Sequence, residues 1–219
     1  MIAERLEILR HRIGQACAAC GRNPADIELL PVSKRQPVNA IREAAALGFM
    51  NFGENYVQEG VAKHQELPEL RFHLIGPLQR NKAKAALEHF QEILTVDRVE
   101  LAARLGHLAN ELHLERGVWI QVDLWNEATK EGGCAEETLP ALLKELADYP
   151  VLQLRGFMAI PPPGQANAFT ELATLRDRWQ QKLGHPLRLS MGMSDDLEEA
   201  IQAGSDQVRI GTALFGERG

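Results

Sequence analysis

Residues 187–212 read LRLSMGMSDDLEEAIQAGSDQVRIGT, and the order of patterns in this stretch decides the fold class. A short apolar run over Leu187–Met191 predicts a strand, and Val208–Ile210 predicts another. Between them, Ser194 has the character of a helix N-cap, followed by two acidic residues in the first turn of a helix that runs to Ala203. The stretch is therefore a strand–helix–strand unit, the building block of α/β proteins with parallel sheets.

The same alternation of strand and helix patterns continues through the rest of the chain. The other expected strands are residues 27–34, 50–53, 72–76, 93–97, 118–123 and 152–160. The expected helices include residues 79–90, 99–114, 136–149 and 168–183. About eight strands that alternate with helices are what a closed parallel barrel requires. The sequence therefore predicts a single (β/α)8 TIM-type barrel, with an open doubly wound sheet as the alternative.

Two features modify this barrel at its beginning. Residues 2–19 place apolar side chains on one helical face and end at Gly21, so an extra N-terminal helix precedes the first strand. Pro31 lies inside the first strand pattern, where it has no N–H group to donate to a sheet. We expect a bulge or an irregular pairing at that point.

Composition limits the class of protein. The 219 residues are 45% hydrophobic and 25% charged, with a net charge of -6 and three cysteines. A single domain over residues 1–219 fits this length, and the thiols fit a reducing, cytoplasmic location. No apolar run approaches the roughly 20 residues that cross a bilayer, and an acidic chain is a poor general binder of nucleic acid. We therefore expect neither a membrane nor a nucleic-acid partner, and no metal site.

Lys34 is the first candidate for chemistry, because it ends the first expected strand. In a parallel barrel the functional groups sit at the carboxyl ends of the strands. Partial desolvation lowers the pKa of a lysine and favours its reaction with an aldehyde. The alternative is a lysine that only extends to solvent from a strand end.

The loops after the last two strands are the second candidate. The small polar residues from Ser190 to Ser194 and at Gly211-Thr212 can present N–H groups and hydroxyls to an anion. Barrels often bind phosphate with these two loops. Arg209 lies in a β-rich run and is either in a structural ion pair or turned toward a polar ligand. Asn55 and His73 follow or lie in the next strands, and His73 is either a pocket residue or a core histidine.

These segments, in this order, resemble the pyridoxal phosphate homeostasis protein family over residues 29–216. The most specific parts are FGENYVQE at 52–59, HLIGPLQRNK at 73–82, and LSMGMS at 189–194 through VRIG at 208–211. Phe72 and Asp123 depart from the family pattern, where tryptophan and asparagine are common. Both departures concern peripheral contacts.

The resemblance implies a fold similar to the barrel domain of alanine racemases, with pyridoxal 5′-phosphate (PLP) as cofactor. Lys34 would form the internal aldimine, a Schiff base, and Arg209 would face the pyridine nitrogen. The other implied cofactor-binding residues are Ser190, Gly211 and Thr212 at the phosphate, with Ser194 contributing, and Asn55 and His73 in the pocket.

The expected function is intracellular PLP homeostasis and carriage, with delivery to PLP-dependent apo-enzymes, rather than turnover. Racemisation needs acid/base groups on both faces of the substrate. In the similar racemases the second group is a tyrosine from a partner's second domain; this chain ends soon after its last expected strand, and Tyr56 and Tyr149 offer no obvious replacement. We therefore expect a monomeric carrier with no catalytic residues. The alternatives are a PLP-dependent amino-acid racemase or lyase, and a barrel enzyme that acts on a phosphorylated metabolite without PLP.

Overall fold

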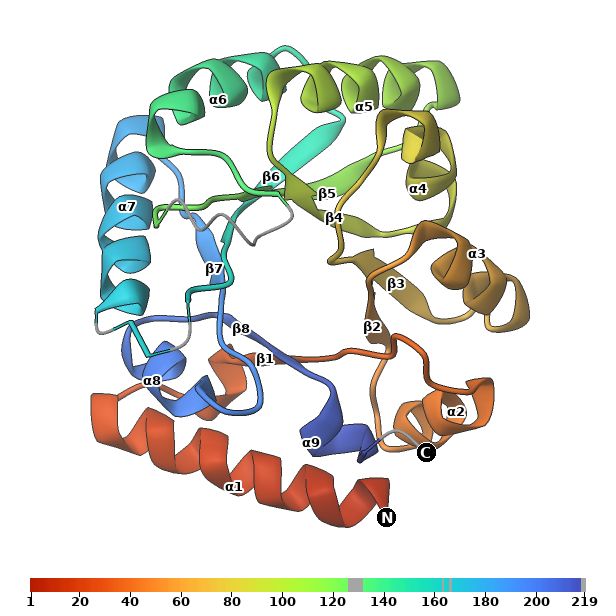
Figure 1. Ribbon diagram of the computed structural model, residues 1–219, viewed down its shortest axis with the longest axis vertical. Coiled ribbons are helices and arrows are strands. Elements are labelled where there is room, and N and C mark those ends of the chain that lie inside the picture. The colour runs from red at the N-terminus through yellow and green to blue at the C-terminus, as the bar shows by residue number, and fades with distance from the viewer. Residues whose placement is uncertain (126–131, 163, 166, 218–219) are drawn as a thin grey trace.

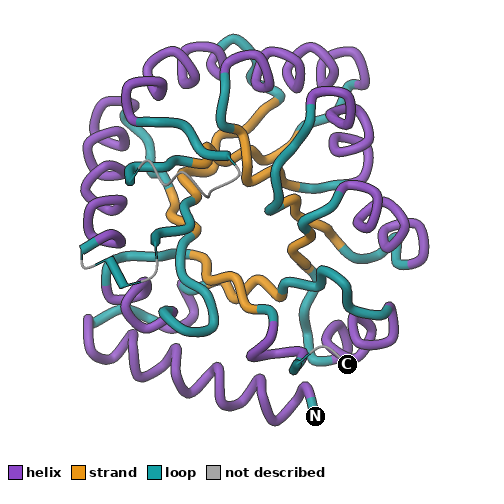
Figure 2. The backbone as a smooth tube through the Cα atoms, in the orientation of Figure 1, coloured by secondary structure: helices purple, strands orange, loops and turns teal. Residues whose placement is uncertain are grey.

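The computed structural model, which describes residues 1–125, 132–162, 164–165 and 167–217, is a ring of parallel strands with helices outside it (Figures 1 and 2). Neighbouring strands follow the order β1-β8-β7-β6-β5-β4-β3-β2, and a bridge between Val32 and Gly53 links β1 back to β2. The predicted eight-stranded parallel barrel is confirmed. The strands are β1 (Glu28–Pro31), β2 (Asn51–Glu54), β3 (Arg71–Leu74), β4 (Glu92–Val96), β5 (Arg116–Gln121), β6 (Leu152–Met158), β7 (Arg188–Ser190) and β8 (Gln207–Ile210).

Helices connect the strands and form the outer layer. The expected extra helix, α1, runs along the outside of the ring beside α8 and α9 (Figure 1). None of the helices in the described part of the chain has the length and apolar character to span a membrane. The helices are α1 (Ile2–Cys20), α2 (Val38–Ala46), α3 (Val57–Glu66), α4 (Ala83–His89), α5 (Val99–Leu112), α6 (Leu139–Ala147), α7 (Ala168–Leu183), α8 (Leu197–Gln202) and α9 (Thr212–Phe215), with short 3-10 turns η1 (Pro24–Asp26), η2 (Arg80–Lys82) and η3 (Glu136–Thr138).

The apolar side chains form two separate clusters. The larger one lies between the strands and the helices and includes Phe52, Phe72 and Phe157, all fully buried. The smaller one consists of Leu94, Trp119 and Met158, with Ile75 and Ile160 packed against it. Side chains alternate between the two faces of each strand, so a closed barrel necessarily has an inner and an outer core.

Pro31 produces the expected irregularity, but as a gap rather than a bulge. The amides of Glu28 and Val32 donate to the carbonyls of Asp206 and Ile210 on the β8 side, at 2.9 and 2.8 Å. Alternation therefore turns position 31 toward β2, where proline has no N–H to give. β1 pairs with β8 in continuous register, whereas within the described residues its backbone pairing with β2 is limited to the bridge after the proline.

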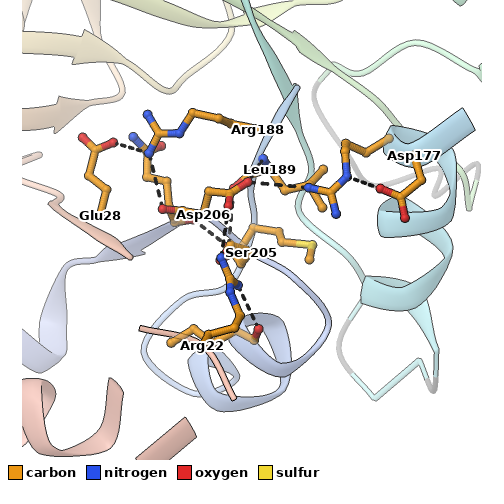
Figure 3. A network of polar contacts seen from close by, with 11 residues as sticks. Arg22, Glu28, Asp177, Arg188, Leu189, Ser205 and Asp206 are labelled. Carbon is orange, nitrogen blue, oxygen red and sulfur yellow. Dashed lines mark hydrogen bonds and ion pairs between the residues drawn. The ribbon is translucent and has the colours of Figure 1, made fainter. Parts of the chain in front are cut away.

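Polar side chains organise the amino-terminal end of the barrel around Asp206, the residue before β8 (Figure 3). One carboxylate oxygen accepts from Arg22, which follows α1, at 3.1 Å. The other accepts from the backbone N–H of Leu189 in β7 at 2.8 Å and pairs with Arg176 of α7 at 3.7 Å. A single carboxylate thus joins α1, α7 and β7 to the start of β8.

Candidate functional site

Lys34 lies in the turn that follows β1 and is half-buried at the carboxyl end of the barrel. The turn is fixed by its neighbours, since the Ser33 amide donates to the Gly53 carbonyl at 2.9 Å. Arg35 has φ +58°, the left-handed conformation that non-glycine residues adopt at a cost. The lysine therefore leaves the strand from a turn whose two flanking residues are both held in a defined geometry.

Arg209 is buried within the barrel and reaches across β7. Its Nη1 donates to the Ser190 carbonyl at 2.7 Å and to the Ser190 hydroxyl at 2.9 Å, and its Nη2 donates to the Ala159 carbonyl at 2.9 Å. Burial lowers the pKa of Arg209 to about 10, while Asp196 acts in the opposite direction. Among the described residues no carboxylate lies within ion-pair distance, so this buried cation is held by neutral oxygen atoms only.

Ser190 ends β7 and is fully buried. Its hydroxyl donates to the side-chain carbonyl of Gln207 at 2.7 Å and accepts from Arg209. The family resemblance implies that this hydroxyl holds the phosphate. In the structure it is already used by two neighbours, and it orients Arg209.

The loop after β7 packs against β8, and the loop after β8 reaches the end of β1. The Arg209 amide donates to the Gly192 carbonyl at 3.0 Å, and an added Cβ on Gly211 would stand 3.7 Å from Val32 of the β1 end. Ser194 is half-buried and Thr212 is exposed at the first position of α9. The structure therefore brings Gly211 and Thr212 next to the segment that carries Lys34.

The expected N-cap at Ser194 is wrong. Helix α8 starts at Leu197, and Asp196 is its N-cap residue. The Asp196 carboxylate accepts from the Met193 amide at 2.6 Å, which closes a turn over residues 193–196 and delays the helix by two residues. Ser194 lies in that turn, where its carbonyl accepts from Arg12 of α1 at 2.8 Å.

Asn55 directly follows β2 and is half-buried at the barrel mouth. It lines a cavity of about 490 Å³ together with Tyr56, Leu78 and Arg98. Gly76 lies against the backbone of Asn55 so closely that a Cβ there would come within 2.1 Å of the Asn55 carbonyl. The absence of a side chain at position 76 therefore allows the two loops to meet.

His73 is not brought together with these residues. Its Nδ1 is 3.7 Å from Glu92, the first residue of β4, and Glu92 also accepts from the Trp119 indole at 2.7 Å. Burial lowers the pKa of His73, against the opposing effect of Glu92. Ile75, two residues later on the same face, occupies the inner cluster nearer the mouth, so His73 lies below that cluster, toward the strand starts.

A buried polar cluster beside Ser33 is not among the residues that the sequence predicts for the site. Lys63 of α3 and Glu54 at the end of β2 are both buried and form an ion pair. The available signal was the spacing of Glu59 and Lys63, four residues apart on one helix. Across the described residues, no three His, Cys, Asp or Glu side chains form an arrangement suited to a metal ion.

Comparison with known proteins places the chain in a family. The family model described as alanine racemase, N-terminal domain, matches residues 5–219. The pyridoxal phosphate homeostasis protein of Pseudomonas aeruginosa is 47% identical over 99% of this chain and 96% of its own length. That of Escherichia coli strain K12 is 43% identical over 99% of this chain and 97% of its own length.

Solved structures support the same family and fold. PipY of Synechococcus elongatus with PLP bound has a TM-score of 0.86 at 40% identity, covering 99% of this chain and all of that one. An alanine racemase of Clostridium difficile has a TM-score of 0.75 at 16% identity; the match covers 98% of this chain and 57% of the racemase, and concerns the fold alone. The chain therefore belongs to the pyridoxal phosphate homeostasis protein family and has the barrel fold of the alanine racemase N-terminal domain.

Proposed function

We propose that this protein binds PLP covalently through Lys34 and acts as a PLP carrier in the homeostasis of that cofactor. The observation that carries the proposal is the buried Arg209, which is held by neutral oxygens beside the β1 end that presents Lys34. When bound, PLP supplies an aldehyde that condenses with amines and a ring that accepts electron density. The bound cofactor of PipY and the homeostasis proteins among the relatives support this choice.

Each part of the cofactor has a matching group in the chain. The Lys34 amine would hold the cofactor through its aldehyde, since amines condense with aldehydes with loss of one water. Arg209 would donate an N–H to the pyridine nitrogen, and its permanent positive charge would oppose protonation of that nitrogen. The Gly211 amide and the Thr212 hydroxyl would bind the phosphate, with a contribution from Ser194. Asn55 faces the mouth from the β2 side.

Carriage is favoured over turnover by where the tyrosines lie. Tyr149 is in the outer layer, where its hydroxyl contacts His107 at 3.2 Å, and Tyr56 is 50% exposed on the loop after β2. Tyr149 is therefore outside the ring of strands, and Tyr56 is largely exposed to solvent. The competing function is a PLP-dependent racemase or lyase. Stereospecific turnover of an amino-acid panel at ordinary enzyme rates, lost on replacement of Lys34, would favour that competitor.

Trapping of PLP on the wild-type protein tests the proposal directly. We expect protein mixed with PLP to absorb near about 420 nm, as bound PLP condensed with an amine does. Borohydride should convert the complex to a stable adduct, and peptide mass mapping should place the adduct on Lys34. A protein that stays colourless and unlabelled would remove the cofactor from this chain and favour the phosphorylated-metabolite enzyme.

Replacement of Thr212 by valine tests the phosphate-binding loop. A hydrogen bond to a charged group contributes about 1.5–3 kcal/mol, so we expect PLP affinity to fall about tenfold or more. Affinity for unphosphorylated pyridoxal should not change. Thr174→Val is the matched control, since that hydroxyl only donates to the Thr170 carbonyl on α7. Equal PLP affinity of wild type and Thr212→Val in a fluorescence titration would contradict the assignment.

A further inference from the structure

Lys63 is a buried lysine that the proposed covalent chemistry does not use. It lies on α3 with its side chain only 7% exposed, and its ammonium group donates to three oxygens. These are the Ser33 carbonyl at 2.6 Å, Glu54 at 2.5 Å and Glu59 at 2.8 Å. An ammonium group has three N–H bonds, so all of its donors are used.

These contacts hold both residues that flank Lys34. The Ser33 carbonyl accepts from Lys63 directly, and the Ser33 hydroxyl donates to Glu54 at 2.6 Å. On the other side, the Arg35 amide donates to Glu59 at 2.5 Å, and Glu59 is in turn paired with Lys63. We call Ser33, Glu54, Glu59 and Lys63 the Lys63 cluster.

The local backbone explains why such a cluster is needed. Within the described residues β2 pairs with β1 only at the Val32–Gly53 bridge, so from the β2 side the turn at Lys34 has one backbone hydrogen bond, from the Ser33 amide to the Gly53 carbonyl. Arg35 has φ +58°, a conformation that costs free energy unless its surroundings enforce it. The Lys63 cluster supplies side-chain bonds from β2 and α3 at this place.

The charges in the cluster also separate the two lysines chemically. Lys63 forms ion pairs with the carboxylates of Glu54 and Glu59. Burial raises the pKa of Glu54, and the positive charge of Lys63 opposes that effect. An ammonium that donates three hydrogen bonds has no lone pair with which to attack an aldehyde. Lys63 therefore does not compete with Lys34 as a nucleophile.

We propose that Lys63 is a positioning residue: it fixes the two peptide groups around Lys34 and thereby sets the direction in which the Lys34 amine meets the cofactor aldehyde. This inference rests on the proposed covalent binding of PLP by Lys34. Lys63 acts through the backbone of residues 33 and 35 and does not touch the cofactor. Its effect should therefore appear only with a ligand that reacts with Lys34.

Lys63→Met tests this inference with two ligands, PLP and pyridoxine 5′-phosphate, which carries the same ring and phosphate but no aldehyde. We expect the affinity for PLP to fall by about tenfold or more, as for loss of buried hydrogen bonds to a charged group. Affinity for pyridoxine 5′-phosphate should stay the same, because the phosphate loops and Arg209 are unchanged. Lys63→Arg keeps the charge and donors, and should restore part of the PLP affinity.

Lys84→Met is the matched control, since it removes an exposed lysine that pairs with Glu88 across one helical turn. A parallel loss for both ligands, or no loss for either, would overturn the positioning role. If Lys63→Met does not fold, Glu59→Ala decides the question, because it removes only the acceptor of the Arg35 amide and one Lys63 contact. The same selective loss of PLP affinity supports the inference, and equal effects on both ligands refute it.

The experiment on wild-type protein distinguishes failure of this inference from failure of the proposed function. Borohydride trapping of wild-type protein at Lys34 establishes the covalent site before any variant is compared. If wild type forms no adduct, the covalent proposal itself fails. If wild type forms the adduct and Lys63→Met binds both ligands as wild type does, only the role of Lys63 is refuted.

Discussion

Protein with Lys34 replaced by alanine should remain colourless near about 420 nm at saturating PLP and should form no adduct with borohydride. Lys34 is half-buried in the turn after β1 and is the residue that we propose to condense with the aldehyde, whereas the buried Lys63 donates to three oxygens. Loss of the covalent bond should weaken PLP binding at least about a hundredfold, or roughly 3 kcal/mol. Absorbance spectra and equilibrium dialysis measure the two effects.

Lys34→Arg is the control that separates charge from chemistry. A guanidinium keeps the positive charge but stays protonated, so it does not condense with an aldehyde at neutral pH. We expect Lys34→Arg to lack the band as Lys34→Ala does. Both variants should retain affinity for pyridoxine 5′-phosphate within the precision of the assay. A band that persists in Lys34→Ala, with an adduct mapped to another lysine, would contradict the assignment of Lys34.

Asp206→Ala should lower the free energy of unfolding by about 3 kcal/mol, measured by urea denaturation. The substitution removes the acceptor of the Leu189 amide in β7 and the partner of Arg22 and Arg176. The Asp206 side chain is 23% exposed, so the lost contacts are partly shielded from water and weigh more than those of a surface pair. Asp206→Asn keeps an acceptor for Leu189 and should lose about half as much.

Asp177→Ala provides the matched control for this effect. Asp177 also pairs with Arg176, at 2.6 Å, but its side chain is 66% exposed. Surface ion pairs contribute about 0–1 kcal/mol, so this variant should unfold almost as wild type does. Equal destabilisation by the two substitutions would show that Asp206 contributes no more to the free energy of unfolding than an exposed aspartate does.

The sequence predicted the barrel well because its signals were local. Helix α7 has the predicted bounds, and each expected strand appears within a few residues of its predicted place. The segments that begin at Gln79 and Glu136 start with 3-10 turns, which the helical pattern did not distinguish from α-helix. Pattern alone locates an element, whereas the geometry of its first turn depends on neighbouring loops.

The candidate site was harder to predict, because it depends on contacts across the sheet. The β-rich context of Arg209 left open a structural ion pair or a polar ligand, and its hydrogen bond to Ser190 is visible only in the three-dimensional structure. The sequence left His73 as either a pocket residue or a core histidine, because the layer it occupies depends on strand stagger, which one sequence does not reveal. Lys63 sits on a largely polar helix, where a lysine is ordinarily a solvated surface residue.

The limited pairing of β1 with β2 has a mechanical consequence. A barrel in which every pair of neighbouring strands is hydrogen-bonded resists local opening equally around the ring. A barrel in which one pair has few backbone hydrogen bonds opens first between those two strands. In the described part of the chain the stretch of β1 unpaired with β2 is residues 28–31, which ends at the Val32–Gly53 bridge before Lys34, while β1 stays joined to β8 and its Arg209 by a continuous register. The barrel can thus yield at this point without changing the spacing between its lysine strand and its arginine strand. A few side chains determine how easily β1 and β2 separate, so a single substitution can change it.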